Sequence, residues 1–170
     1  MPSGNPKKFG TGGSGQAADM VRVELSRIII SELQEEQIIV LKEIDGERKF
    51  PIVIGTREAK EIDRRLKGQL STRPMTHDLL ATVIEKLGGT VERIDILDLQ
   101  DHTFFASIVV RKNQTKAPGK TAGKLSAKDA AASEPFDLIS VDSRPSDAIA
   151  LGVATEVPIF VSELVLSRVC

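Results

Sequence analysis

The segment FDLISVDSRPSDAIALGVATEVPIFV, residues 136–161, constrains the fold more than any other part of the chain. A β-rich run leads into a Ser-Arg-Pro-Ser-Asp sequence, an apolar helical run follows, and a second apolar strand closes the segment. This order places two carboxylates, Asp142 and Asp147, and one guanidinium, Arg144, at a strand-to-helix junction. Free backbone N–H groups and the positive end of the helix dipole favour anions at such a place. The junction is therefore a candidate anion or metal site.

The hydrophobic period predicts the other elements. Residues 21–54 contain three runs rich in Val and Ile, which predict three strands, and Pro51 inside the third favours an edge position or a bulge. The changes between period 2 and period 3.6 predict β-hairpins at 37–54 and 90–110 and helices near 57–66, 77–87 and 147–154. We expect an α+β fold with antiparallel or mixed β-sheets and about three α-helices in a single domain.

Local signals predict several boundaries. Thr56 and Thr76 are the expected N-caps of the first two helices, and Asp101-His102 is the expected turn of the second hairpin. Residues 1–19 contain almost nothing to bury, so we expect a disordered tail there and a folded domain over 20–170. Residues 113–135 are small, polar and rich in Lys, which predicts a flexible loop insertion within that domain.

Composition limits the classes of function. The 170 residues suit one domain, and the formal net charge of −1 argues against tight binding of nucleic acid by the whole surface. The single cysteine, Cys170, excludes an intrachain disulfide and a cysteine-cluster zinc site. No apolar run is long enough to cross a membrane, so we expect a cytoplasmic protein without a membrane partner. Many short strands with exposed edges favour a homodimer or a higher homo-oligomer.

Four segments, in order, carry a resemblance to a known family. They are Phe50-Pro51-Ile52-Val53-Ile54-Gly55, then Arg73-Pro74 with Thr76-His77-Asp78-Leu79-Leu80, then Asp142-Ser143-Arg144-Pro145-Ser146-Asp147-Ala148-Ile149-Ala150-Leu151, and Pro158-Ile159-Phe160-Val161. Together they resemble the bifunctional nuclease domain family over about residues 21–166. The resemblance implies an α+β domain, dimers, and nuclease activity on RNA and DNA. It supplies no catalytic residues, which must be argued from the chain itself.

The helix start near residue 76 is the first candidate for phosphodiester chemistry. It holds Arg73, a potential phosphate ligand, together with His77 and Asp78. The imidazole of His77 can exchange a proton near neutral pH, so His77 and Asp78 are candidate catalytic residues. The alternative is purely structural, because an acidic residue in the first turn of a helix also serves the helix dipole.

The junction before residue 148 is the second candidate. Arg144 can clamp a phosphate with two parallel N–H groups, and Ser146 can add a hydroxyl. Asp142 and Asp147 are candidate catalytic residues and candidate ligands of Mg²⁺ or Mn²⁺, ions that prefer carboxylates and water. The alternative is that Arg144 pairs with a carboxylate and only braces the junction.

Two functions from different classes follow. The first is a nuclease that hydrolyses phosphodiester bonds of RNA and DNA with low sequence specificity and with the help of a divalent metal. The second is a non-catalytic regulatory module of the same fold that binds an anion or a partner. No phosphate loop, dinucleotide fingerprint or zinc-protease motif is present, so no organic cofactor is expected. Convergence of His77, Asp78, Asp142 and Asp147 in one cleft would favour the enzyme, and separate salt bridges would favour the binding module.

Overall fold

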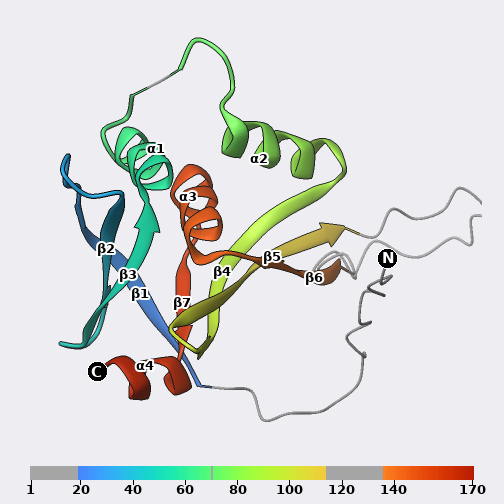
Figure 1. Cartoon of the computed structure of the whole chain (residues 1–170). Helices are drawn as coiled ribbons and strands as arrows, with labels where there is room; N and C mark the ends of the chain where they lie inside the picture. The colour runs from blue at the N-terminus through green and yellow to red at the C-terminus, as the bar shows by residue number, and fades with distance from the viewer. Residues whose placement is uncertain (1–18, 70, 114–135) are drawn as a thin grey trace, which may run out of the picture.

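The computed structural model describes residues 19–69, 71–113 and 136–170 (Figure 1). The first half of the chain forms β1 (Met20–Ile29), β2 (Glu36–Glu43), β3 (Lys49–Gly55), α1 (Thr56–Leu66) and α2 (Thr76–Lys86). The second half forms β4 (Gly89–Gln100), β5 (Thr103–Asn113), β6 (Phe136–Ser143), α3 (Pro145–Thr155), β7 (Ile159–Ser162) and α4 (Glu163–Val169). The expected α+β class is confirmed, and α4 is a fourth helix that the sequence patterns did not predict.

One mixed sheet contains the strands of the described chain, in the order β3-β2-β1-β7-β4-β5-β6. The four-residue β7 pairs antiparallel with β1 and parallel with β4, so that Ile159 lies between Val23 and Ile94. The remaining neighbours are antiparallel. A strand from the end of the sequence therefore joins an N-terminal half of the sheet, β3-β2-β1, to a second half, β4-β5-β6.

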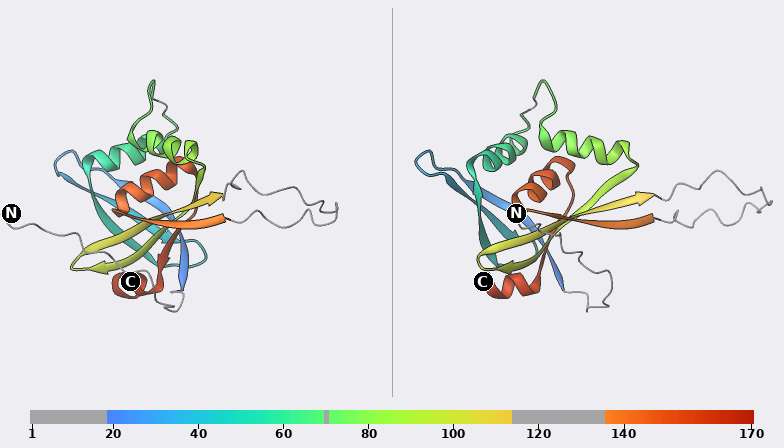
Figure 2. Two further views of the ribbon diagram at one scale, coloured as in Figure 1. Left: turned by 90° about the vertical axis from the view of Figure 1, so that its right-hand side faces the viewer. Right: turned by 45° about the vertical axis from the view of Figure 1, so that its right-hand side comes forward.

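Helices α1, α2 and α3 gather at one end of this curved sheet, and α4 lies at the opposite end beside the tip of the β4–β5 hairpin (Figures 1 and 2). Helix α3 contacts α1, α2, β4 and β5. Its residues Ala148, Ile149, Ala150 and Leu151 are completely buried, which is why this helix is apolar all round. No helix in the described part of the chain is long and apolar enough to cross a membrane.

Two predictions, one about an edge strand and one about a hairpin turn, are confirmed. Pro51 lies in β3, which is an edge strand, where a missing N–H leaves no gap in the interior of the sheet. Asp101 and His102 form the turn between β4 and β5, and both adopt left-handed backbone angles, with φ of 46° and 62°. Positive φ at both central residues is typical of a tight hairpin turn of type I′.

The expected cap of the first helix is wrong. The N-cap of α1 is Gly55, which has no side chain to offer. The Thr56 hydroxyl instead donates to the backbone carbonyl of Glu35 at 2.9 Å and accepts from the side-chain amide of Gln37 at 3.1 Å. Thr56 therefore ties α1 to the loop before β2. The predicted tail and flexible loop lie outside the described residues, apart from Asp19 and Asn113.

Gly152 sets how closely α3 approaches the sheet. A Cβ atom at this position would lie 2.8 Å from Cγ1 of Ile94, in the centre of β4. We therefore expect Gly152→Val to lower the free energy of unfolding by about 1–3 kcal/mol through overpacking. Ala154→Val, at a half-buried position of the same helix, should cost only the helix propensity of valine, below about 1 kcal/mol. Urea unfolding measures both, and equal effects would contradict this account of the contact.

Candidate functional site

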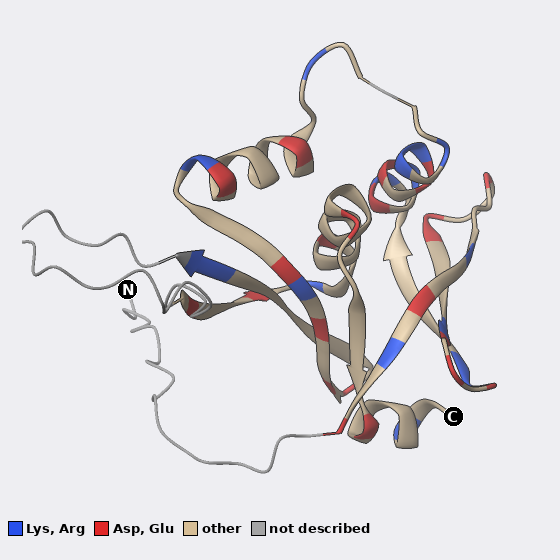
Figure 3. Cartoon of the chain, turned by 180° about the vertical axis from the view of Figure 1, so that it is seen from behind, with Lys and Arg blue, Asp and Glu red and all other residues tan. Residues whose placement is uncertain are grey.

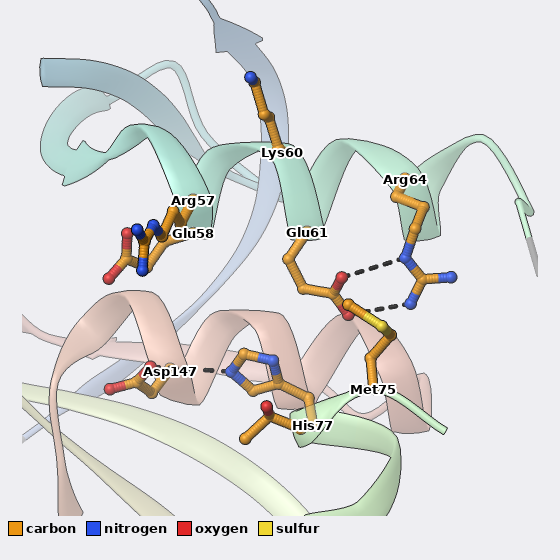
Figure 4. A pocket seen from close by; sticks show the side chains of 9 residues that line it. Arg57, Glu58, Lys60, Glu61, Arg64, Met75, His77 and Asp147 are labelled. Atoms are coloured by element: carbon orange, nitrogen blue, oxygen red, sulfur yellow. Dashed lines mark hydrogen bonds and ion pairs between the residues drawn. The ribbon is translucent and has the colours of Figure 1, made fainter. Parts of the chain in front are cut away.

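The fold brings the two predicted junctions together, because α3 packs against both α1 and α2. A hollow of about 600 Å³ lies between these helices. We call it the helix pocket, and Figure 4 shows its side chains: Arg57, Glu58, Lys60, Glu61, Arg64, Met75, Thr76, His77 and Asp147. Two candidate catalytic residues from distant parts of the sequence, His77 and Asp147, thus line one cavity.

The Asp147 carboxylate is the centre of the arrangement. Oδ1 lies 3.7 Å from Nε2 of His77, which projects from the first turn of α2 and is largely buried. Oδ2 accepts a hydrogen bond from Nε of Arg144 at 2.7 Å, and Oδ1 accepts one from Nη2 of Arg144 at 3.0 Å. The imidazole and the guanidinium therefore converge on one carboxylate. Pro145 at the start of α3 fixes the backbone between Arg144 and Asp147.

Arg144 has a second acidic neighbour. Its Nη2 lies 3.3 Å from Oε1 of Glu58, in the first turn of α1. Asp147 and then Glu58 raise the pKa of Arg144 above its ordinary value, so this side chain stays cationic at all working pH values. The Arg144 side chain is nevertheless 66% exposed, which leaves part of it open to an incoming anion. The predicted brace is confirmed as a contact, and the open side is compatible with a phosphate clamp.

Asp78 has a different environment. Its Oδ2 accepts a hydrogen bond from the backbone N–H of Met75 at 2.9 Å. Asp78, and not Thr76 as expected, therefore provides the capping hydrogen bond at the start of α2. Its Oδ1 lies 2.9 Å from Nη2 of Arg65, which ties α2 to α1. The Met75 N–H, with further help from Arg65 and Arg64, holds the pKa of Asp78 below its usual range. The structure thus engages Asp78 in holding the two helices together.

We expect the stabilisation by Asp78 to depend on pH. Because the folded-state pKa is lowered, the contribution is fully present above the unfolded-state pKa of about 3.9 and is lost as the pH falls through the folded-state value. Asp78→Asn keeps an acceptor for the Met75 N–H but removes the negative charge, so it should lower the free energy of unfolding by up to about 1 kcal/mol at pH 7. The difference from wild type should shrink as the pH falls below the unfolded-state pKa and vanish once Asp78 is protonated in the folded state. A difference that persists unchanged at low pH would contradict the charge argument.

The remaining predicted site residues lie apart from the helix pocket. Arg73 is exposed in the connection between α1 and α2. Asp142 is exposed near the end of β6, where it pairs in register with Ser107 of β5. Ser146 is buried at the start of α3 and faces a second hollow. The four acids and bases that would favour the enzyme therefore converge only in part: His77 and Asp147 meet, whereas Asp78 and Asp142 do not line this pocket.

The second hollow, which we call the sheet pocket, has a volume of about 770 Å³. It lies between β3, the tip of the β4–β5 hairpin, and the starts of α1 and α3. Its walls include Ile52, Phe104, His102, Arg144, Ser146 and Arg168. Glu58 lines both pockets, and Arg144 of the sheet pocket pairs with Asp147 of the helix pocket, so the two hollows adjoin.

The carboxylates fit only a sparse type of metal site. The described residues contain no group of three or more His, Cys, Asp or Glu side chains placed to share an ion. Mg²⁺ commonly uses one or two carboxylates and completes its shell with water and substrate oxygens, which requires no such group. Asp147 can ligate such an ion only if one of its carboxylate oxygens separates from Arg144. Asp142, on β6, can contribute only if the substrate bridges the two carboxylates.

The charged face of α1 has two roles. Arg64 and Arg65 both contact Glu61, at i,i+3 and i,i+4 spacing, and lower the pKa of Glu61, chiefly through Arg64. In addition, Arg57, Lys60 and Arg64 line the helix pocket. The sequence signal for this part of the pocket is the local density of basic residues on one helix, which is also typical of a solvated face.

Comparison with known proteins assigns the chain to a family. The family model of the bifunctional nuclease domain, which describes its sequence pattern, matches residues 39–170. The chain therefore belongs to the bifunctional nuclease domain family. Two proteins from two strains of Mycobacterium tuberculosis, uncharacterized protein Rv1829 and uncharacterized protein MT1877, are each 32% identical over 149 residues, covering 88% of this chain and 76% of each relative. The resemblance first identified from four motifs is thereby confirmed.

Proposed function

We propose that the protein is a nuclease that hydrolyses phosphodiester bonds of RNA and DNA with little sequence preference. The observation that carries the proposal is the convergence of His77 and Arg144 on Asp147 in the helix pocket. An acid–base group and a phosphate ligand are two of the requirements of phosphodiester hydrolysis, and here they arise from helix starts distant in sequence. Membership of the bifunctional nuclease domain family supports the proposal, and the names of the two relatives state no activity.

In this proposal His77 is the catalytic residue. Its neutral imidazole takes a proton from the attacking water while the water oxygen bonds to phosphorus. The bond from phosphorus to the leaving oxygen breaks, and the imidazolium returns the proton to that oxygen. Arg144 holds two phosphate oxygens and stabilises the charge that develops on them, with Arg73 as a further phosphate ligand on the connection above α2. Asp147 is a positioning residue that orients both His77 and Arg144.

Metal assistance by Mg²⁺ or Mn²⁺ is part of the proposal. Asp147, with Asp142, would hold the ion together with water and phosphate oxygens. Such an ion would supply Lewis-acid stabilisation of the phosphate and lower the pKa of a bound water. The catalytic roles first assigned to Asp78 and Asp142 stay predictions.

The charge distribution supports low sequence specificity. Figure 3 shows that basic and acidic positions are intermixed along the described strands and helices. Affinity must then come from local phosphate contacts, which carry no sequence information by themselves. A cytoplasmic location belongs to the same proposal and rests on the sequence argument alone.

The test is cleavage of single-stranded RNA and DNA by purified protein in Mg²⁺, in Mn²⁺ and in EDTA. We expect cleavage with metal, and at least a 100-fold loss of kcat in His77→Gln and in Asp147→Asn, the usual effect of removing acid–base catalysis. Asp63→Asn is the matched control, because Asp63 pairs with Lys67 on α1 and lines neither pocket. Cleavage that survives both substitutions unchanged would come from elsewhere or from a contaminant and would overturn the assignment.

The alternative function is a regulatory module that binds an anion or a partner without cleaving it. One observation favours it: Asp78 and Asp147 are each held by arginine, in separate ion pairs. A module of this kind would bind oligonucleotide or another polyanion through Arg144 and release it intact in all three buffers. The cleavage assay, combined with a binding measurement on the same sample, separates the two functions.

We also propose that the protein forms a homo-oligomer. The support is β6, an edge strand whose described residues from 136 to 142 are all exposed, including the apolar side chains Phe136, Leu138, Ile139 and Val141. An exposed apolar edge with unpaired backbone groups is a template for a second strand. A second copy of the same strand can satisfy the edge by antiparallel pairing about a twofold axis.

Light scattering measures this directly. We expect wild-type protein at micromolar concentration to have at least twice the mass of the 18.4 kDa chain. The double substitution Leu138→Lys with Val141→Lys places charge on the edge and should yield monomers. Leu164→Lys, at an equally exposed apolar residue of α4, should leave the mass unchanged. A monomeric wild type would refute the oligomer, and an oligomeric double variant would exclude this edge as the interface.

A further inference from the structure

The sheet pocket differs chemically from the helix pocket. Its walls combine aliphatic side chains, from Ile52 and Ile54 of β3 and from Leu99 of β4, with polar and charged ones, and Phe104 supplies an aromatic surface. Phe104 is half-buried and stacks on the fully buried Phe50, with ring centroids 6.0 Å apart, so its position is fixed from behind. A volume of about 770 Å³ lies within the range of small-molecule sites. The hollow is therefore suited to a flat group with apolar faces and polar edges.

A buried polar group lies in its wall. Ser146 is only 7% exposed as a residue, and its hydroxyl has no hydrogen-bond partner among the described residues. The hydroxyl is not one of the enclosed polar atoms that lack a partner, so it is open to the hollow and to solvent there. A ligand in the hollow can take the place of that solvent and pair with the hydroxyl. The hydroxyl both donates and accepts, which matches the polar edge of a heteroaromatic ring.

The charges of the sheet pocket argue against an anion as its main occupant. Two arginines and two glutamates line it, and the arginines are engaged: Arg168 contacts Asp98 at 2.9 Å, and Arg144 contacts Asp147 and Glu58. The lining therefore has almost no net charge. A neutral group with apolar faces and hydrogen-bonding edges fits this combination better than a phosphate does.

We propose that the sheet pocket is a nucleobase subsite that receives one unpaired base of a single-stranded nucleic acid. The base would lie against Phe104 and the aliphatic walls, and its edge would meet Ser146 and His102. The inference rests on the proposed function and adds a substrate class to it. A base within a duplex cannot enter such a hollow without leaving its stack, which costs a few kcal/mol.

The position of Arg144 connects the subsite to the proposed chemistry. Arg144 lines the sheet pocket and contacts Asp147, which lines the helix pocket beside His77. In the proposed subsite, a phosphate held by Arg144 would place its base in the sheet pocket and its ester bond beside the helix pocket. The base contributes affinity and orientation, and the contact is tolerant of sequence because every base has an aromatic face.

The test compares binding of three fluorescent probes of equal length: a single-stranded DNA oligomer, the same backbone with abasic sites throughout, and the duplex form. We expect wild-type protein to bind the single strand at least about tenfold more tightly than the abasic or duplex probe, since stacking contributes about 1–3 kcal/mol per base. Ser146→Ala and His102→Gly should each reduce this ratio severalfold. His102 adopts a positive φ that glycine accepts without strain, so this variant should fold at least as well as wild type.

Asp101→Asn is the matched control, because Asp101 occupies the same turn, shares its left-handed backbone and does not line the pocket. A ratio near one in wild type would overturn the subsite, as would a ratio that survives both pocket substitutions. Cleavage of the three probes, measured separately, tests the proposed function. Base-dependent binding without cleavage would support the subsite and count against the nuclease. Equal binding and equal cleavage of the single-stranded and abasic probes would support the nuclease and refute the subsite.

Discussion

The burial of α3 is the constraint on which the rest of the structure depends. Four consecutive residues of this helix, from Ala148 to Leu151, are inaccessible to solvent, and β7 follows directly to join the two halves of the sheet. Because α3 contacts α1 and α2 as well as β4 and β5, its N-terminus is held where three helices meet. Both pockets open at that N-terminus. A change that loosened α3 would therefore alter the fold and the candidate site together.

The elements were predictable from the sequence, whereas their arrangement was not. Period 2 and period 3.6 located both hairpins and three helices, because the spacing of apolar residues along the chain is a local property that the sequence alone shows. The short α4 was not predicted, because its seven residues follow β7 without a break. Its only clear start signal is Ser162, whose hydroxyl accepts a hydrogen bond from the Val165 N–H at 3.3 Å. The insertion of β7 between β1 and β4 depends on contacts between residues such as Val23 and Ile159, which no local pattern encodes.

The candidate site shows the same division. Helix-start chemistry pointed to His77 and Asp147, and the fold brings them to 3.7 Å. The same chemistry pointed equally to Asp78, which is committed to Met75 and Arg65, and local sequence cannot distinguish a carboxylate that faces a cavity from one that joins two helices. The sheet pocket was not predictable at all. It requires β3 and the β4–β5 hairpin to face each other, and a position such as His102 is an ordinary exposed turn residue until that happens.

The shared carboxylate gives the proposed site a simple response to substrate. Arg144 is bidentate to Asp147 in the free protein, yet the Arg144 side chain is 66% exposed, and such exposed pairs contribute little net stability in water. A phosphate dianion or diester that binds Arg144 competes for the same N–H groups at small cost. Oδ1 of Asp147, once released, lies near Nε2 of His77 and becomes available to orient the imidazole, and either released oxygen becomes available to ligate an ion. In the proposed function, the ion pair seen here is thus the resting state of the site, and phosphate binding converts a structural brace into a catalytic arrangement.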